Sequence, residues 1–242
     1  MNYLQITGSP RGETTAKMEV IDNFGQTRIC QGSNSIYPLQ VDSATAIYSN
    51  GIILSCGGIS PRTDQCFIYE KSKGWKQLSK MNQAMDRSAS IPIDGGMIVT
   101  GGYDDGNNVL KFSQIIFSNG SVITDGPELP EPRYGHCLAY DKENEVFFVT
   151  GGNYDKKIAW KFKDKEKFTL IETTRMKHDR VFHGCGIVKS TKHSGRPLLV
   201  VARSSSGTGR NNCEFYDYTK HGSKWQLCSK FISSFLVFIS QK

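Results

Sequence analysis

A short apolar run that ends on a pair of glycines recurs along this chain, and no other feature constrains the fold as strongly. The full pairs are Gly57-Gly58, Gly101-Gly102 and Gly151-Gly152, and weaker copies are Gly8-Ser9 and Ala202-Arg203. Counted at Gly8, Gly58, Gly102, Gly152 and Ala202, the copies lie 50, 44, 50 and 50 residues apart. Repetition at an interval of this size is typical of solenoids and propellers, in which each repeat is one structural unit.

The segments around each pair predict four antiparallel strands per repeat. The apolar runs, at residues 4–7, 52–56, 97–100, 146–150 and 198–201, are too short and too β-branched for helices. If the apolar run is counted as the first strand, a polar loop and a second strand follow it, as in QCFIYE (65–70) and KIAWKF (157–162). A third strand often opens on a large aromatic residue, and an arginine then leads into a fourth strand. The aromatic residues are Trp75, Phe168 and Trp225, and the arginines are Arg87, Arg133 and Arg180.

These repeats resemble kelch repeats, the blades of a family of β-propellers. The resemblance rests on the glycine pairs, the arginines and the aromatic pairs Tyr69/Trp75, Phe162/Phe168 and Tyr218/Trp225, and it covers essentially the whole chain. It implies an all-β propeller of about five four-stranded antiparallel blades over residues 1–230, the outer ones degenerate or incomplete. The expected blades are about 1–42, 43–86, 87–132, 133–179 and 180–230.

Residues 231–242 form an apolar tail with two alternative roles. It is either the strand that closes a five-bladed ring, or the last part of an incomplete six-bladed domain. The tail lacks the arginine and the His/Cys pattern of the other inner strands, which favours the incomplete domain. An open propeller would leave strand edges exposed.

Most of the residues that carry the resemblance are expected to hold the fold together. A strand near a propeller axis is crowded and must turn sharply outward, which favours residues without a Cβ. Aromatic side chains fill the wider gap between blades further from the axis. The expected structural residues are Gly57, Gly58, Gly101, Gly102, Gly151, Gly152, Tyr69, Trp75 and Trp225.

Composition indicates a globular protein without a nucleic-acid surface. The chain has 242 residues, of which 38% are hydrophobic and 22% charged, and a formal net charge of +7. Its basic residues are scattered among acidic ones, so they form no stripe for nucleic acid. No apolar stretch approaches the roughly 20 residues of a membrane span. The first residues lack the features of a secretory signal, and we therefore expect a cytoplasmic protein.

The seven cysteines predict thiols rather than a disulfide framework. Their number is odd, and six fall in pairs at apparently equivalent repeat positions: Cys66/Cys213, Cys137/Cys185 and Cys30/Cys228. Equivalent positions in blades that are not neighbours are too far apart for a disulfide. Only Cys137 and Cys185, on neighbouring inner strands, need checking. Buried thiols in a reducing compartment are the simpler interpretation.

The sequence offers no catalytic constellation. His136, Cys137, His183 and Cys185 suggest a metal, but adjacent strand residues point to opposite faces and the spacing is not that of a zinc site. Neither a nucleophile elbow nor a phosphate-binding loop occurs. We predict no metal, no cofactor and no enzymatic activity. The alternative is a small-molecule enzyme on the same ring, of the sugar isomerase or oxidase type.

A protein-binding surface is the function that remains. In kelch propellers, loops gather around the central channel on one face, and the resemblance places nine candidates there. They are Arg62, Arg87, Tyr103, Asp104, Arg133, Tyr134, Tyr154, Arg180 and Arg203. Arginines at one pore mouth suit an acidic partner segment, although such arginines equally often bond the backbone of the next blade. Many kelch proteins are ubiquitin-ligase adaptors with a BTB domain, which this chain lacks.

Overall fold

The computed structural model describes residues 3–7, 17–21, 27–29, 44–47, 52–59, 62–70, 72–163, 169–189, 195–205 and 207–228. The described residues form strands, turns and loops without an α-helix, so the all-β prediction is confirmed for this part of the chain. Correspondingly, these residues contain no helix of the length and apolarity that a membrane crossing requires. The apolar tail at 231–242 lies outside the described residues, as do Gly8, Cys30 and Phe168.

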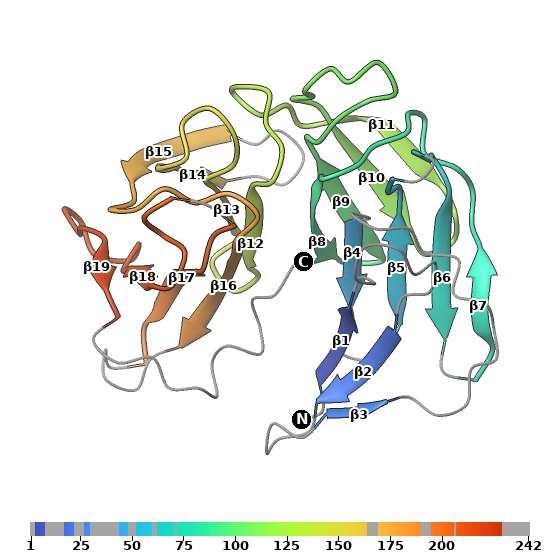
Figure 1. Cartoon of the computed structure of the whole chain (residues 1–242), viewed down its shortest axis with the longest axis horizontal. Helices are drawn as coiled ribbons and strands as arrows, with labels where there is room; N and C mark the ends of the chain where they lie inside the picture. Colours follow the sequence, from blue (N-terminus) through green and yellow to red (C-terminus); the bar gives the residue numbers. More distant parts are fainter. Residues whose placement is uncertain are drawn as a thin grey trace. The chain divides into compact units, whose positions relative to one another are not determined.

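The strands form one three-stranded and four four-stranded antiparallel sheets, each from strands consecutive in sequence (Figure 1). The three-stranded sheet contains β1 (Tyr3–Thr7), β2 (Lys17–Ile21) and β3 (Thr27–Ile29). The next two sheets contain β4 (Ala44–Ile47), β5 (Ile53–Cys56), β6 (Cys66–Glu70) and β7 (Gly74–Gln77), then β8 (Ala89–Ile93), β9 (Gly96–Thr100), β10 (Ser113–Phe117) and β11 (Val122–Gly126). The last two contain β12 (Cys137–Asp141), β13 (Val146–Thr150), β14 (Ile158–Lys163) and β15 (Thr169–Arg175), then β16 (Gly184–Lys189), β17 (Pro197–Ala202), β18 (Cys213–Tyr216) and β19 (Gln226–Leu227).

All five predicted apolar runs are strands, namely β1, β5, β9, β13 and β17. In the four-stranded sheets the apolar run is the second strand, and every described residue of β5, β9 and β13 is buried. Outer strands such as β15 are largely exposed. A second strand buried on both faces is expected where the faces of neighbouring sheets pack on each other, since both sets of side chains must then be apolar.

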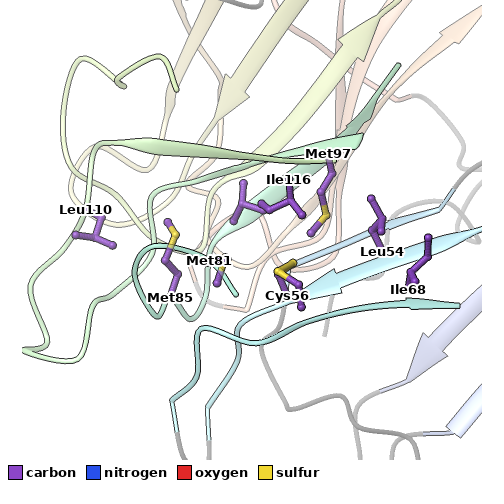
Figure 2. Packing of buried hydrophobic residues seen from close by; sticks show 10 residues of the cluster. Leu54, Cys56, Ile68, Met81, Met85, Met97, Leu110 and Ile116 are labelled. Carbon is purple, nitrogen blue, oxygen red and sulfur yellow. A yellow bond between two sulfur atoms is a disulfide. The ribbon is translucent and has the colours of Figure 1, made fainter. Parts of the chain in front are cut away.

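The chain divides into two compact units, Met1–Pro132 and Arg133–Gln241, and each has its own core. In the first unit β4 lies beside β8, and a cluster of ten buried residues joins the two four-stranded sheets. Figure 2 draws these residues as sticks and labels eight of them: Leu54, Cys56, Ile68, Met81, Met85, Met97, Leu110 and Ile116. Apolar side chains alternating along β5, β6, β9 and β10 supply most of this cluster.

In the second unit β12 lies beside β16, and a similar cluster joins the two sheets. The cluster includes Phe148, Leu199, Val201 and Trp225. The ring of Trp225 stacks on Tyr216 with the centroids 5.4 Å apart, as Trp75 packs on Tyr69 at 5.3 Å in the first unit. The equivalent of Tyr69 is therefore Tyr216 rather than Tyr218, the partner that the sequence suggested.

The glycine pairs have the two properties expected from the sequence, an unusual backbone conformation and a close approach to neighbouring backbone. All six glycines have a positive φ, between 58° and 115°. A Cβ on Gly57 would lie 2.3 Å from the carbonyl oxygen of Met85, and one on Gly151 would lie 2.4 Å from that of Arg180. Because both oxygens belong to the segment that leads into the next sheet, the missing Cβ is what permits the two sheets to approach.

The degenerate fifth pair is displaced by one residue from the predicted Ala202-Arg203. The N–H of Arg203 donates to the carbonyl of Asn212 at 3.0 Å, as that of Gly57 donates to Gln65 at 3.0 Å, and Arg203 has a φ of 60°. Ala202 is still part of β17. Arg203-Ser204 therefore takes the place of the glycine pair, with an arginine in a left-handed conformation.

Three disulfides correct the prediction of free thiols. They are Cys56–Cys66, Cys137–Cys185 and Cys213–Cys228, with Cα–Cα distances of 4.1, 5.9 and 5.5 Å. Cys56–Cys66 joins β5 and β6, and Cys213–Cys228 joins β18 to the residue that follows β19. Both pairings depend on strand register, which the count of cysteines could not reveal. The third joins β12 and β16 and is the pair that the sequence marked for checking.

Candidate interaction surface

Two sets of loops contain the predicted binding residues, one set in each unit. In each set, the loop after a second strand packs on the segment that leads into the next sheet. The Gly58 N–H donates to the carbonyl of Met85 at 2.9 Å in the first unit, and the Gly152 N–H donates to that of Arg180 at 2.9 Å in the second. The local structure is therefore the same in both units, and the side chains decide what each loop set can bind.

Arg62 holds the loops of the first unit together. Its Nη2 donates to Asp86 Oδ2 at 3.1 Å and to Asn107 Oδ1 at 3.2 Å, and its Nη1 donates to the carbonyl of Asp104. Only 14% of the Arg62 side chain is exposed and that of Asp86 is fully buried, so this ion pair is shielded from water. Arg62 thus ties the loop after β5 to the loop after β9, and both of its terminal nitrogens are engaged inside the protein.

Asp104 is likewise occupied by hydrogen bonds from its own loop and from the segment that leads into β8. Its carboxylate accepts hydrogen bonds from Asn108 N at 2.8 Å, Asn108 Nδ2 at 3.0 Å and Gln83 Nε2 at 3.3 Å. The side-chain hydrogen bond from Asn108, followed by its backbone one, holds the pKa of Asp104 below its usual value. Nearby, the guanidinium of Arg87 lies 5.7 Å from the ring centroid of the half-buried Tyr103.

Arg133 lies inside the second unit, with no exposed surface. Its Nη1 donates to the carbonyl of Gly151 at 2.5 Å, and its guanidinium stacks over the ring of Trp160 at 4.0 Å from the centroid. A guanidinium in this position stabilises the buried turn at the glycine pair and packs against β14. A partner protein has no access to it.

Arg180 is also fully buried and has a still denser set of partners. Its Nη2 donates to Glu214 Oε1 at 2.8 Å and to Asn212 Oδ1 at 2.7 Å, and its Nη1 donates to the carbonyl of Arg203 at 2.8 Å. Burial lowers the pKa of Arg180, while the hydrogen bond and charge of Glu214 act in the opposite direction. Of the two roles open for these arginines, the geometry of Arg133 and Arg180 fits the bonding of backbone.

Arg87 does not occupy the same repeat position as the other two arginines. Cys137 and Gly184 are equivalent, because each pairs with the last residue of the following strand, Thr150 and Ala202 respectively. Arg133 and Arg180 each lie four residues before this position. In the preceding sheet Ala89 pairs with Thr100, and the residue four before it is Met85. The carbonyls of Met85 and Arg180 accept equivalent glycine N–H groups, those of Gly58 and Gly152. The prediction that the three arginines occupy equivalent repeat positions is therefore wrong.

The second unit exposes two aromatic residues on its loop set. Tyr154 is 69% exposed and Phe182 is 37% exposed, and the ring of Tyr134 lies 6.0 Å from that of Phe182. Hydrogen bonds from Asn153 N to the Tyr134 carbonyl, at 3.0 Å, and from Ser205 N to the Val181 carbonyl, at 2.9 Å, hold the neighbouring loops together. Tyr134, Tyr154, Phe182 and the exposed Arg203 therefore lie on neighbouring loops of the second unit, and we call these four residues the aromatic surface.

Backbone strain concentrates on these loops. Among the described residues, six other than glycine have a positive φ, and five of them lie in the two loop sets: Arg87, Asn107, Tyr154, Phe182 and Arg203. A left-handed conformation at an aromatic residue costs free energy, and such residues cluster at functional sites. Sequence analysis missed Phe182, because the residue follows the predicted arginine in an otherwise apolar segment.

The histidine and cysteine residues near these loops do not gather into a metal site. Cys137 and Cys185 are bonded to each other, and His183 Nε2 lies 2.8 Å from Thr150 Oγ1. Desolvation lowers the pKa of His183 to about 3, with a further contribution from the charge of Arg180. Within the described residues, no group of three or more His, Cys, Asp and Glu side chains is placed to hold a metal ion.

Comparison with known proteins adds no family assignment. No protein-family model matches the chain, and none of the curated proteins matches it.

Proposed function

We propose that the chain is a kelch-type β-propeller domain that acts as a protein–protein interaction module. Three features support the propeller: consecutive four-stranded antiparallel sheets, an apolar second strand that ends on a left-handed pair, and first strands that lie side by side within each unit. In a propeller, radially arranged sheets would place their inner strands and the loops between them around a common axis.

The observation that carries the proposed function is the aromatic surface. Residues held in a left-handed backbone conformation cluster at functional sites, and exposed groups of apolar side chains mark interaction sites. Tyr154 and Phe182 would bury their rings against an apolar segment of a partner, and aromatic residues of this kind commonly dominate binding energy. Arg203 and Arg210, both exposed, add positive charge at the same loops. The partner segment should therefore combine apolar residues with Asp or Glu.

A displayed library of short random peptides tests this proposal directly. Peptides selected on the purified chain should be rich in Asp, Glu and apolar residues, and their affinity can be measured by fluorescence anisotropy. Combining Tyr154→Ala, Phe182→Ala and Arg203→Gly should weaken binding at least about tenfold, since each residue contacts the peptide. Glycine at position 203 suits the left-handed backbone there, so this change should leave the fold intact.

The matched control removes two positive charges elsewhere. Lys220→Ala with Lys224→Ala changes exposed residues that follow β18 and should leave peptide affinity unchanged. Circular dichroism verifies that both variants are folded. If the control variant weakens binding as much as the triple variant does, binding depends on net charge, and the aromatic surface is not the site.

A further inference from the structure

We propose that the chain folds in an oxidising compartment, because its disulfides Cys56–Cys66, Cys137–Cys185 and Cys213–Cys228 join six of the seven cysteines and need such a compartment to form. The bonds lie in both units, and their Cα–Cα distances of 4.1, 5.9 and 5.5 Å fall in or close to the range that a disulfide allows. The inference replaces the expectation of a cytoplasmic protein with buried thiols.

The repeats themselves show that the cysteines occur as pairs. Strand register makes Cys66, Ser113, Ala159 and Cys213 equivalent, since each is paired with the last residue of the preceding strand. Where this position is cysteine, a second cysteine faces it from the neighbouring segment. Cys56 faces Cys66, and Cys228, which follows the pair Leu227 and Glu214, donates its N–H to the carbonyl of Cys213 at 3.1 Å.

The other two repeats provide the contrast. Ser113 faces Thr100 and Gly126, and Ala159 faces Thr150 and Thr174. Cysteine therefore occurs on a facing strand only when the central position is also cysteine. Packing of small side chains alone would not couple the two positions, because Ser, Thr, Ala and Gly fill the same spaces in the other repeats. A disulfide, in contrast, requires a cysteine at both positions.

A different geometry joins Cys137 to Cys185. The register makes Gly184 the equivalent of Cys137, so Cys185 lies one position further along its strand. Successive strand residues point to opposite faces, and the offset of one therefore turns the two side chains toward each other between the adjacent strands β12 and β16. Two cysteines at truly equivalent positions would point the same way and could not meet.

The chemistry requires an external oxidant. For each bond, two thiols lose two protons and two electrons to a disulfide, either glutathione disulfide or the active-site disulfide of an oxidoreductase, which is reduced to two thiols. Cys56 and Cys66 are 1% and 0% exposed, so they should react before the core closes and resist reductants afterwards. Oxidants of this kind maintain protein disulfides in secretory and extracellular compartments, whereas cytosolic thiols are kept reduced.

Mapping the cysteines in the full chain tests the proposal. The reduced, unfolded chain is refolded in a glutathione redox buffer, its remaining thiols are alkylated with N-ethylmaleimide, and the unreduced peptides are analysed by mass spectrometry. We expect three cross-linked peptide pairs with the stated connectivity and a single alkylated cysteine, Cys30. A folded chain with seven alkylated cysteines, or with other pairings, would overturn the proposal.

Thermal unfolding separates bonded cysteines from cysteines that merely pack. Reduction during unfolding should lower the thermal midpoint of the wild-type chain by at least about 10 °C, since each disulfide restrains the unfolded state. A variant with all six cysteines changed to alanine should already have the low midpoint and should not respond to reductant. If a chain that was reduced while unfolded and then refolded in reductant has the midpoint of the untreated wild type, the cysteines serve only for packing.

Discussion

The residue that leads into each sheet is matched to one particular side chain on the third strand. Met85 accepts a hydrogen bond at its sulfur from Gln114 at 2.8 Å, Arg133 stacks over Trp160, and Arg180 pairs with Glu214. Gln114 and Glu214 also share a second interaction, because each accepts a backbone N–H from the segment that leads into its sheet. Asn82 N donates to Gln114 at 2.8 Å, and Lys177 N donates to Glu214 at 2.6 Å. A buried position thus tolerates methionine or arginine according to its partner.

Exchanging one pair for another tests this coupling. Arg180→Met should lower the free energy of unfolding by about 3–5 kcal/mol, because it removes the fully buried guanidinium that pairs with Glu214. Adding Glu214→Gln recreates the Met85/Gln114 pair of the other unit and should restore most of that loss. Urea denaturation of the two single variants and the double variant gives the coupling energy. Losses that simply add in the double variant would show that the two positions are independent.

At the scale of strands, the sequence predicted well which segments form strands and predicted poorly which residues occupy equivalent positions in the repeats. Continuous apolar runs predicted β5, β9, β13 and β17, since buried second strands need apolar side chains on both faces. The positions of Met85, Arg203 and Tyr216 were misassigned by one or two residues, because loops of different length shift the repeats. Such shifts matter for function: a displacement of one residue turns a side chain to the other face of the sheet.

The candidate site was predictable only in part, for a related reason. The sequence located the loops, but it does not distinguish an arginine that is exposed from one that is buried. Whether Arg133 and Arg180 face solvent depends on the carbonyls and the acidic partner that surround them in three dimensions. The disulfides Cys56–Cys66 and Cys213–Cys228 were missed because they depend on which residues face each other across two strands.

The contact between β13 and the segment before β16 should make stability depend on pH. His183 is buried, and desolvation lowers its pKa from 6.5 to about 3; the pKa of buried His136 is also lowered well below 6.5, mainly by desolvation. Between those values the unfolded chain binds protons that the folded chain excludes. Stability is therefore complete above about pH 6.5 and falls with decreasing pH, by about 1.4 kcal/mol per pH unit for each proton.

His183→Gln should reduce the dependence of the free energy of unfolding on pH between pH 6.5 and 4.5. The expected reduction is the contribution of one proton, about 1.4 kcal/mol per pH unit, and urea unfolding at several pH values measures it. His221→Gln changes an exposed histidine and serves as the control, with a slope expected to match that of the wild type. An unchanged slope in the His183 variant would mean that His183 can be protonated without loss of the fold.

For the whole molecule, the second unit contains the parts that an independent domain needs. It has a core that includes Phe148, Leu199 and Trp225, two disulfides and the complete aromatic surface. Its two sheets are also linked by the Tyr218 hydroxyl, which donates to Asp141. Hydrogen bonding to this carboxylate, after desolvation, raises the pKa of Tyr218, so the link persists at neutral pH.

We therefore expect residues 133–242, produced alone under oxidising conditions, to unfold cooperatively and to bind the selected peptides with an affinity close to that of the full chain. Leu199→Ala in this fragment should lower the free energy of unfolding by about 2–5 kcal/mol, because Leu199 is fully buried. Calorimetry and anisotropy measure the two properties separately. A folded fragment that does not bind would mean that the first unit contributes to the partner site, whereas a fragment without a cooperative transition would mean that its sheets depend on those of the first unit for stability.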